Sequence, residues 1–235
     1  MEPILFYGVP EGSSFGSIVA LEWSGQPYKL CRIRMPEDVT SDKYTRLNPR
    51  AETPAMITED GYAISESVAI LHHLGARVID KKLAFRQGTE DFDRFNQVIC
   101  FLNTDFYDSF ATLWYAFEHD LDESGKETLT ATGRDKVQKA HADLDVMIGD
   151  SKWLMGDQRT LADAYFFGIA RWTDFHKFLG RSDYPNIHRL YEKLKEDPAV
   201  RFAHAIEHEE PATSTGGFAG QVSLDDALRL MKKPA

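Results

Sequence analysis

The chain has 235 residues, 43% of them hydrophobic and 27% charged, a balance typical of a packed globular protein rather than a disordered one. Its formal net charge of −10 repels phosphate backbones and anionic membranes, so neither nucleic acid nor a membrane is expected as a partner. No apolar run approaches the roughly 20 residues that cross a bilayer, and Glu2 stands where a signal peptide would carry a base. These features predict a cytoplasmic protein.

Strand-like and helix-like segments alternate over the first third of the chain. Gly25 follows an apolar helical stretch in the position of a C-cap, and the Asp60-Gly61 step is a two-residue hairpin signal. The predicted elements are strands at 4–7, 28–35, 55–58 and 62–64, helices at 15–24, 42–47 and 65–74, and a loop at 8–14. This order predicts a four-stranded mixed sheet with helices on its faces.

After residue 78 the strand signals stop and helical spacing replaces them. Residues 80–88 have the composition of a linker, and helices are predicted from residue 90 to residue 208. One apolar stripe with steps of three and four residues consists of Phe92, Phe95, Ile99, Leu102, Phe106, Phe110, Leu113 and Phe117. Residues 211–220 (PATSTGGFAG) are predicted to be a flexible linker, and Ser223 is predicted to cap a short helix that runs to Met231.

Short motifs in both halves of the chain resemble the glutathione transferase family. They are Thr53-Pro54-Ala55 before the hairpin, residues 65–70 (SESVAI) after it, and then residues 103–110 (NTDFYDSF), 153–156 (WLMG), 160–165 (TLADAY) and Arg171-Trp172. The motifs of the helical half are similar to the bacterial beta class, and the resemblance spans residues 4–207. It implies a homodimer with a thioredoxin-like glutathione-binding domain at residues 1–79 and an all-helical bundle domain at 89–210. Residues 211–235 are then predicted to be a flexible C-terminal extension.

The resemblance assigns glutathione to residues on both sides of the hairpin. It implies a cis peptide bond at Pro54, which turns the backbone N–H and C=O of Thr53 toward the cysteinyl part of glutathione. Helix N-terminal N–H groups bind carboxylates, so Ser67 would hold the γ-glutamyl carboxylate while Glu66 pairs with the ammonium group. The alternatives are an ordinary turn proline and a serine, Ser65 or Ser67, that only caps the helix.

A hydroxyl group near the first loop is the predicted activator of the glutathione thiol. A free thiol has a pKa of about 8.5 and is mostly protonated at neutral pH, and one hydroxyl donor stabilises the thiolate by about 1.5–3 kcal/mol. In related classes the activator is a tyrosine at the end of the first strand, or a serine or cysteine in the following loop. Ser13 is therefore the first candidate, Tyr7 the second and Ser14 the third. The alternative is that Ser13 caps the helix and Tyr7 packs in the core.

Three positions depart from the beta-class pattern. Ser13 replaces a cysteine, which removes the mixed disulfide that a thiol forms with glutathione. Tyr107 replaces a histidine, and it remains a candidate contact for a hydrophobic electrophile because it can still donate a hydrogen bond. Glu37 falls where a lysine would hold the glycyl carboxylate. The candidate substitutes for that lysine are Arg34, Lys43 and Arg50.

The predicted function is a transferase, with glutathione as co-substrate and no metal, that activates the thiol for attack on a small hydrophobic electrophile. Conjugation and the related lyase, dehalogenase and reductase reactions remain open. The alternative is a non-catalytic module of the same fold that binds a protein partner through residues 211–235. His204 and His208 fit a zinc-peptidase pattern, but they are predicted to lie at a solvated helix end. Cys31 and Cys100 are predicted to be buried thiols.

Overall fold

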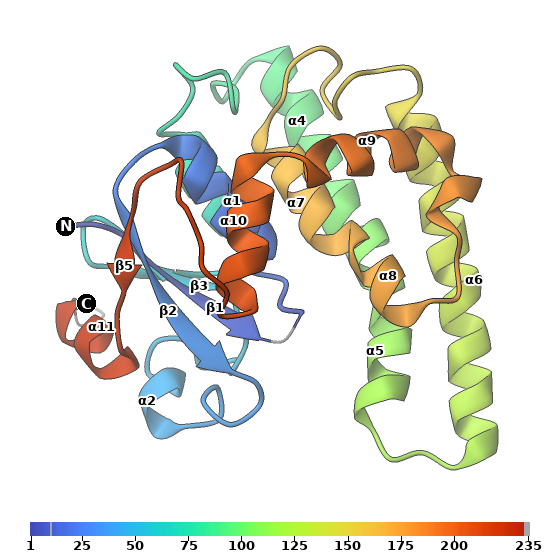
Figure 1. Ribbon diagram of the computed structural model, residues 1–235, viewed down its shortest axis with the longest axis horizontal. Coiled ribbons are helices and arrows are strands. Elements are labelled where there is room, and N and C mark those ends of the chain that lie inside the picture. Colours follow the sequence, from blue (N-terminus) through green and yellow to red (C-terminus); the bar gives the residue numbers. More distant parts are fainter. Residues whose placement is uncertain (10, 233–235) are drawn as a thin grey trace. The chain divides into compact units, whose positions relative to one another are not determined.

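The computed structural model describes residues 1–9 and 11–232, which form two compact units (Figure 1). One unit combines residues 1–84 with the stretch that begins at Lys195, and the other unit is Phe85–Leu194. The helical unit ends before the predicted boundary at residue 210, because helix α10 (Pro198–Glu207) packs on helix α1 (Phe15–Ser24) of the first unit. Within the described residues, every helix is too short or too polar to traverse a bilayer.

A five-stranded sheet with the order β4-β3-β1-β2-β5 lies in the first unit. Its strands are β1 (Ile4–Val9), β2 (Tyr28–Arg34), β3 (Ala55–Ile57), β4 (Ala63–Ser65) and β5 (Phe218–Gln221). Strands β1 and β2 are parallel, with Tyr7 opposite Arg32, and β3 is antiparallel to both β1 and β4. The predicted mixed sheet is confirmed. The predicted count of four strands is wrong, because β5 adds a further parallel strand beside β2.

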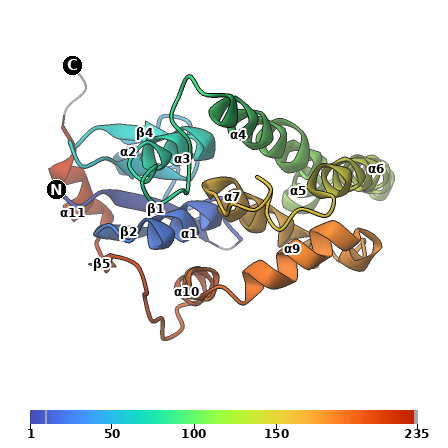
Figure 2. The same ribbon diagram turned by 90° about the horizontal axis from the view of Figure 1, so that it is seen from above.

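Helices pack on both faces of this sheet. Helix α1 is buried almost all round, because it contacts β1, α3 (Ser67–Gly75) and α10, and Figure 2 shows α10 beside α1. Helices α2 (Asp42–Thr45) and α11 (Leu224–Leu230) pack on the opposite face. The buried apolar cluster of that face consists of Ile4, Phe6, Cys31, Ile33, Val39, Tyr44, Leu47, Ala55, Ile57 and Ala227. Alternate residues of β1 therefore supply the two layers of the core.

The C-terminal segment is not the flexible extension that its composition predicted. Residues 218–221 form β5, and Ser223 is the N-cap of α11: its side chain accepts a hydrogen bond from the N–H of Asp226 at 3.2 Å, as the capping prediction required. The glycines of this segment permit close approach. A Cβ atom on Gly216 would lie 2.4 Å from the carbonyl oxygen of Glu22, and one on Gly217 would lie 2.0 Å from that of Gln26. Residues 233–235 of the predicted extension lie outside the described residues.

A buried carboxylate holds this segment on α1. The side chain of Glu22 is nearly inaccessible, and it accepts hydrogen bonds from the hydroxyls of Tyr28 at 2.5 Å and Ser214 at 2.7 Å. It also accepts from the backbone N–H groups of Thr215 at 3.0 Å and Gly216 at 2.9 Å. Four donors satisfy the charge, which is the condition under which a buried carboxylate stabilises a fold.

The second unit is helical. Its elements are α4 (Glu90–Phe101), the π-helix η1 (Leu102–Tyr107), α5 (Ala111–Glu118), α6 (Glu123–Ile148), α7 (Leu161–Ala170), α8 (Trp172–His176), the 3-10 helix η2 (Arg181–Asp183) and α9 (Pro185–Lys195). The capping box of Thr160 and Asp163 begins the fully buried α7. The predicted apolar stripe is buried from Phe95 through η1 to Leu113, whereas Phe117 at its end is exposed. Cys31 is buried as predicted, whereas Cys100 is exposed, contrary to the prediction.

Candidate functional site

The first loop and the proline turn meet in the first unit. The hydroxyl of Ser13 donates a hydrogen bond to the carbonyl oxygen of Thr53 at 3.0 Å, and the Thr53–Pro54 peptide bond is cis as predicted. The two segments are close because Gly8 has no side chain, since a Cβ atom there would lie 2.3 Å from the Oγ1 atom of Thr53. Ser13 is half-buried, and Pro54 is buried. The structure thus brings together three residues that the sequence assigned to one site.

Ser14, the third candidate for thiol activation, is turned toward the protein interior. It has no accessible surface, and its Oγ atom accepts a hydrogen bond from the N–H of Gly8 at 3.1 Å. It stands at the N-cap position of α1, but its side chain accepts no hydrogen bond from the first turn of that helix. Ser14 therefore fixes the path of the loop on which Ser13 is presented.

Tyr7, the second candidate, is a buried residue of β1 with no accessible surface. Its hydroxyl accepts a hydrogen bond from the side-chain amide of Gln221 at 2.9 Å, and the guanidinium of Arg32 lies 5.9 Å from its ring centre. Burial raises the pKa of the Tyr7 hydroxyl above its usual value, although the hydrogen bonds to Gln221 and Arg32 act in the opposite direction. The partner on β5 was not foreseen, because 214 residues separate it from Tyr7.

Glu66 and Ser67 lie where β4 ends and α3 begins. Ser67 is the first residue of α3 and is buried, while Glu66 has an exposed side chain and an unusual backbone with φ 71° and ψ 125°. A positive φ is uncommon for a residue other than glycine, and such outliers cluster at binding and catalytic sites. Ser67 thus stands at a helix N-terminus, where the predicted carboxylate site stays a prediction.

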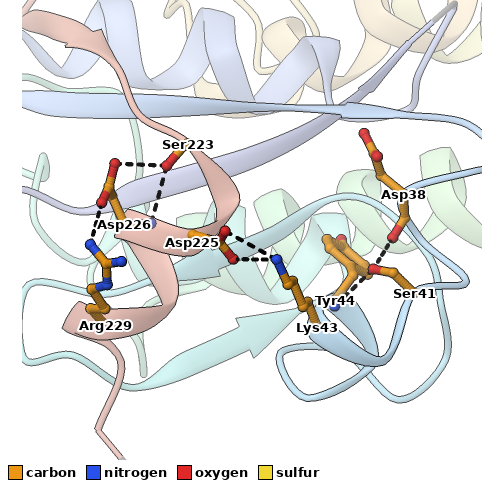
Figure 3. A network of polar contacts seen from close by, with 8 residues as sticks. All are labelled: Asp38, Ser41, Lys43, Tyr44, Ser223, Asp225, Asp226 and Arg229. Atoms are coloured by element: carbon orange, nitrogen blue, oxygen red, sulfur yellow. Dashed lines mark hydrogen bonds and ion pairs between the residues drawn. The ribbon is translucent and has the colours of Figure 1, made fainter.

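The cations suggested as substitutes for a glycyl-binding lysine lie in different surroundings. The Nε atom of Arg50 is 3.0 Å from the carboxylate of Glu52 and 3.5 Å from that of Glu66. The Nζ atom of Lys43 lies 2.9 Å from the carboxylate of Asp225 on α11 (Figure 3). Arg34 is exposed, as is Glu37. Arg50 is the candidate that contacts another predicted site residue.

Tyr107 belongs to the helical unit, at the end of η1. Its side chain is half-buried, and its ring lies 5.2 Å from that of Trp172. Trp172 continues an aromatic cluster through Trp114, whose ring centre is 5.4 Å away and whose buried Nε1 atom has no hydrogen-bond partner among the described residues. Trp172 is buried, so in this cluster Tyr107 and Trp114 are the half-buried aromatic residues.

The histidine pair predicted to be a solvated helix end does not belong to a metal cluster of the described residues. The rings of His204 and His208 are stacked, with their centres 4.1 Å apart, and both residues are exposed. In the ranges 1–9 and 11–232, no three His, Cys, Asp or Glu side chains are grouped as metal ligands.

Both halves of the chain match one protein family. Residues 14–77 match "Glutathione S-transferase, N-terminal domain", and residues 106–198 match "Glutathione S-transferase, C-terminal domain". The chain is 28% identical over 205 residues to Glutathione S-transferase GstA of Escherichia coli O157:H7. This match covers 86% of this chain and 98% of that protein. The chain is 26% identical over 166 residues to Glutathione S-transferase GST-4.5 of Xanthomonas campestris pv. campestris, which covers 71% of this chain and 80% of that protein.

Solved structures share the fold at lower identity. The glutathione transferase URE2P8 of Phanerochaete chrysosporium, with oxidized glutathione, has a TM-score of 0.80 at 18% identity and covers 88% of this chain and 96% of that chain. The glutathione-S-transferase of Xylella fastidiosa has a TM-score of 0.78 at 23% identity, covering 88% and 99%. The bacterial beta class glutathione S-transferase of Sphingomonas chungbukensis has a TM-score of 0.75 at 24% identity, covering 87% and 98%. These likenesses confirm the predicted pairing of a thioredoxin-like domain with a helical domain.

Proposed function

This chain belongs to the glutathione S-transferase family, and we propose that its sheet unit binds glutathione and activates the glutathione thiol for attack on a hydrophobic electrophile. The observation that carries the proposal is the contact between the Ser13 hydroxyl and the Thr53 carbonyl, beside a cis proline at the position the family resemblance assigns to glutathione. The hydroxyl donor, Ser13, is thus hydrogen-bonded to Thr53, the residue whose backbone would pair with glutathione.

Thr53 supports the binding half of the proposal. Its carbonyl oxygen has two lone pairs, so it can accept from the cysteinyl N–H of glutathione as well as from Ser13. A substrate paired there in the manner of a short strand carries its sulfur past the first loop. The Ser13 hydroxyl has a single proton, so it rotates away from the Thr53 carbonyl to donate to the thiolate, and the cysteinyl N–H remains the donor to that carbonyl.

Ser13 is preferred over the two other hydroxyls because of exposure. Ser14 and Tyr7 have no accessible surface, and each accepts a hydrogen bond from a protein N–H group, from Gly8 and Gln221 respectively. Lowering the thiol pKa by about 2 units requires about 2.7 kcal/mol, and a hydrogen bond to a charged group contributes about 1.5–3 kcal/mol. One serine is thus sufficient for the task.

The γ-glutamyl group is assigned to the start of α3. The helix N-terminus and the Ser67 side chain attract its carboxylate, and the exposed Glu66 carboxylate attracts its ammonium group. The Nε atom of Arg50 lies 3.5 Å from the Glu66 carboxylate and holds the Glu66 side chain at the surface of the site. We assign the electrophile to an apolar surface that includes Tyr107, beside Trp172.

Conjugation is the reaction that these residues favour. A serine at position 13 forms no mixed disulfide with glutathione, so the hydroxyl acts by stabilising the thiolate of the substrate rather than by exchanging with it. The thiolate carries the bond-forming electron pair to the electrophile, and the leaving group departs with its own pair. We also propose that the chain acts as a homodimer in the cytoplasm. The packed state of residues 218–230 disfavours the alternative of a module that binds a protein partner through this segment.

The test is the ultraviolet absorption of thiolate in the enzyme–glutathione complex as a function of pH, together with turnover of a hydrophobic aryl halide. We expect a bound thiol pKa below that of free glutathione, and a return toward the free value in Ser13→Ala. Glutathione that binds with an unchanged thiol pKa would contradict activation, and failure of calorimetry to detect binding would contradict the whole proposal.

A further inference from the structure

The C-terminal segment, residues 211–232, is anchored to the first unit at three separate places. The first is the Glu22 carboxylate, which binds residues 214–216. The second is β5, which pairs with β2 and whose Gln221 binds Tyr7. The third is α11, which packs beside α2. The third contact leads to the proposed glutathione site.

Helices α11 and α2 share one apolar cluster. Ala227 of α11 and Tyr44 of α2 both have no accessible surface, and the partly buried Leu224 and Leu228 pack against the same cluster. At the rim, the Lys43 ammonium lies between the two carboxylate oxygens of Asp225, at 2.9 and 3.0 Å (Figure 3). An exposed ion pair alone contributes about 0–1 kcal/mol, so the buried apolar contact holds the two helices together and the ion pair sets their register.

Tyr44 of helix α2, together with Asn48 just after this helix, fixes the chain turn that precedes Pro54. The Tyr44 hydroxyl donates to the carbonyl oxygen of Glu52 at 2.8 Å, and the side-chain amide of Asn48 donates to the same oxygen at 2.8 Å. Glu52 is the residue before Thr53, so these two donors fix the peptide unit that leads into the proposed binding residue. One of the two side chains that fix this turn, Tyr44, therefore belongs to the apolar cluster that α11 shares.

We propose that the C-terminal segment is a positioning element of the glutathione site. Helix α11 fixes α2, and Tyr44 of α2 fixes the turn of Glu52, Thr53 and Pro54. The inference rests on the proposed function in one respect, namely that Thr53 binds glutathione. Ala227 thus acts on glutathione affinity through the cluster that contains Tyr44, and Asp225 acts through Lys43 of the same helix α2, without either residue touching the substrate.

The experiment compares the full chain with a chain that stops after Val222, which removes α11 and keeps β5 and the Glu22 contacts. Coupling between two parts of a fold changes affinity by roughly 5–150-fold, and we expect the glutathione Kd and KM to rise within that range while kcat at saturating glutathione is retained. Hydrogen exchange at the amides of residues 48–53 should become faster. The matched control is Arg229→Gln on α11, whose side chain pairs with Asp226 and points away from Lys43 (Figure 3).

Two further variants keep the test independent of whether the shortened chain folds. Tyr44→Phe removes only the hydroxyl that binds Glu52, and it should raise the glutathione Kd and speed exchange at residues 48–53. Lys43→Glu and Asp225→Lys each break the ion pair. The double variant, in which the two charges are exchanged, should restore the glutathione affinity that either single change loses. The inference is overturned if the glutathione Kd and the hydrogen exchange at residues 48–53 are unchanged both in a folded shortened chain and in Tyr44→Phe. The proposed function would still stand. Faster exchange in a protein that never binds glutathione would support the mechanical link and sink the proposed function.

Discussion

The loop at residues 11–14 and the segment at 211–217 both consist largely of small residues but have different roles. Both contain glycine and hydroxyl-bearing residues, and both contain a glycine at which a Cβ atom would collide with backbone, Gly12 at 2.2 Å and Gly216 at 2.4 Å. The loop presents Ser13 half-exposed, whereas Ser214 of the C-terminal segment donates to a buried carboxylate. Small residues thus mark close packing as readily as flexibility, and the partner of the serine distinguishes the loop that we propose to activate the thiol from a structural segment.

The largest effect should come from the buried carboxylate that holds the C-terminal segment. In Glu22→Gln the negative charge that four donors satisfy is lost, and an amide NH₂ group replaces one of the two acceptor oxygens, so that the hydroxyls of Tyr28 and Ser214 must turn to accept from it. We expect the free energy of unfolding to fall by about 3–5 kcal/mol, measured by chemical denaturation at pH 7. The exposed Glu210→Gln is the control. Equal losses in the two variants would mean that the four contacts of Glu22 contribute nothing specific.

The reactive side of the comparison is tested by Ser13→Ala. Loss of about 2–3 kcal/mol of thiolate stabilisation should cut turnover with an aryl halide by about 30–150-fold, while glutathione binding changes little. Steady-state kinetics and calorimetry measure the two quantities. Tyr7→Phe keeps the ring packed and removes the other hydroxyl. A large loss in Tyr7→Phe with a mild one in Ser13→Ala would transfer the activating role to Tyr7.

A third serine extends the comparison to a helix N-terminus. Ser67→Ala should weaken glutathione binding by about 1.5–3 kcal/mol, because a hydroxyl donor to the γ-glutamyl carboxylate is lost. Calorimetric titration measures the change, and Ser65→Ala on β4 is the control. Unchanged affinity in Ser67→Ala and in Glu66→Ala together would falsify the assignment of the γ-glutamyl group to this helix.

The smallest expected effect concerns glycine itself. In Gly216→Ala the added methyl group meets the backbone of Glu22, which cannot rotate away as a side chain would. We expect the free energy of unfolding to fall by about 1–3 kcal/mol, visible as a lower melting temperature. A melting temperature equal to that of the unchanged protein would show that residues 211–217 tolerate displacement, as a linker does.

Much of the fold followed from local sequence patterns. The hairpin around Asp60-Gly61, the C-cap at Gly25 and the capping box of Thr160 and Asp163 depend on neighbours along the chain, and all three are present. The cis bond at Pro54 followed from the family resemblance and is also present. Such features are predictable because the few residues that produce them are adjacent in sequence.

The errors have a common physical cause, which is contact between distant parts of the chain. Ser214 finds Glu22 across 192 residues, and Gln221 finds Tyr7 across 214, so neither pairing leaves a local pattern. Composition alone therefore assigned the C-terminal segment to a linker, and four strands were predicted where five are present. In the candidate site, the assignment of Ser13 and Thr53 to one site followed from motif order, and the packing of Tyr7 in the core was the stated alternative. The direct hydrogen bond between Ser13 and Thr53 and the burial of Ser14 were visible only in three dimensions.

The position of β5 has a consequence for the solubility of the folded protein. A sheet edge exposes unpaired N–H and C=O groups, which recruit strands from other molecules and lead to aggregation. Here the edge strands are β4 with three residues and β5 with four, whereas the seven-residue β2 lies inside the sheet. Short edge strands offer too few ladder bonds to template a stable intermolecular pair. Loss of the C-terminal segment would turn the long β2 into an edge, and concentrated protein would then self-associate through it.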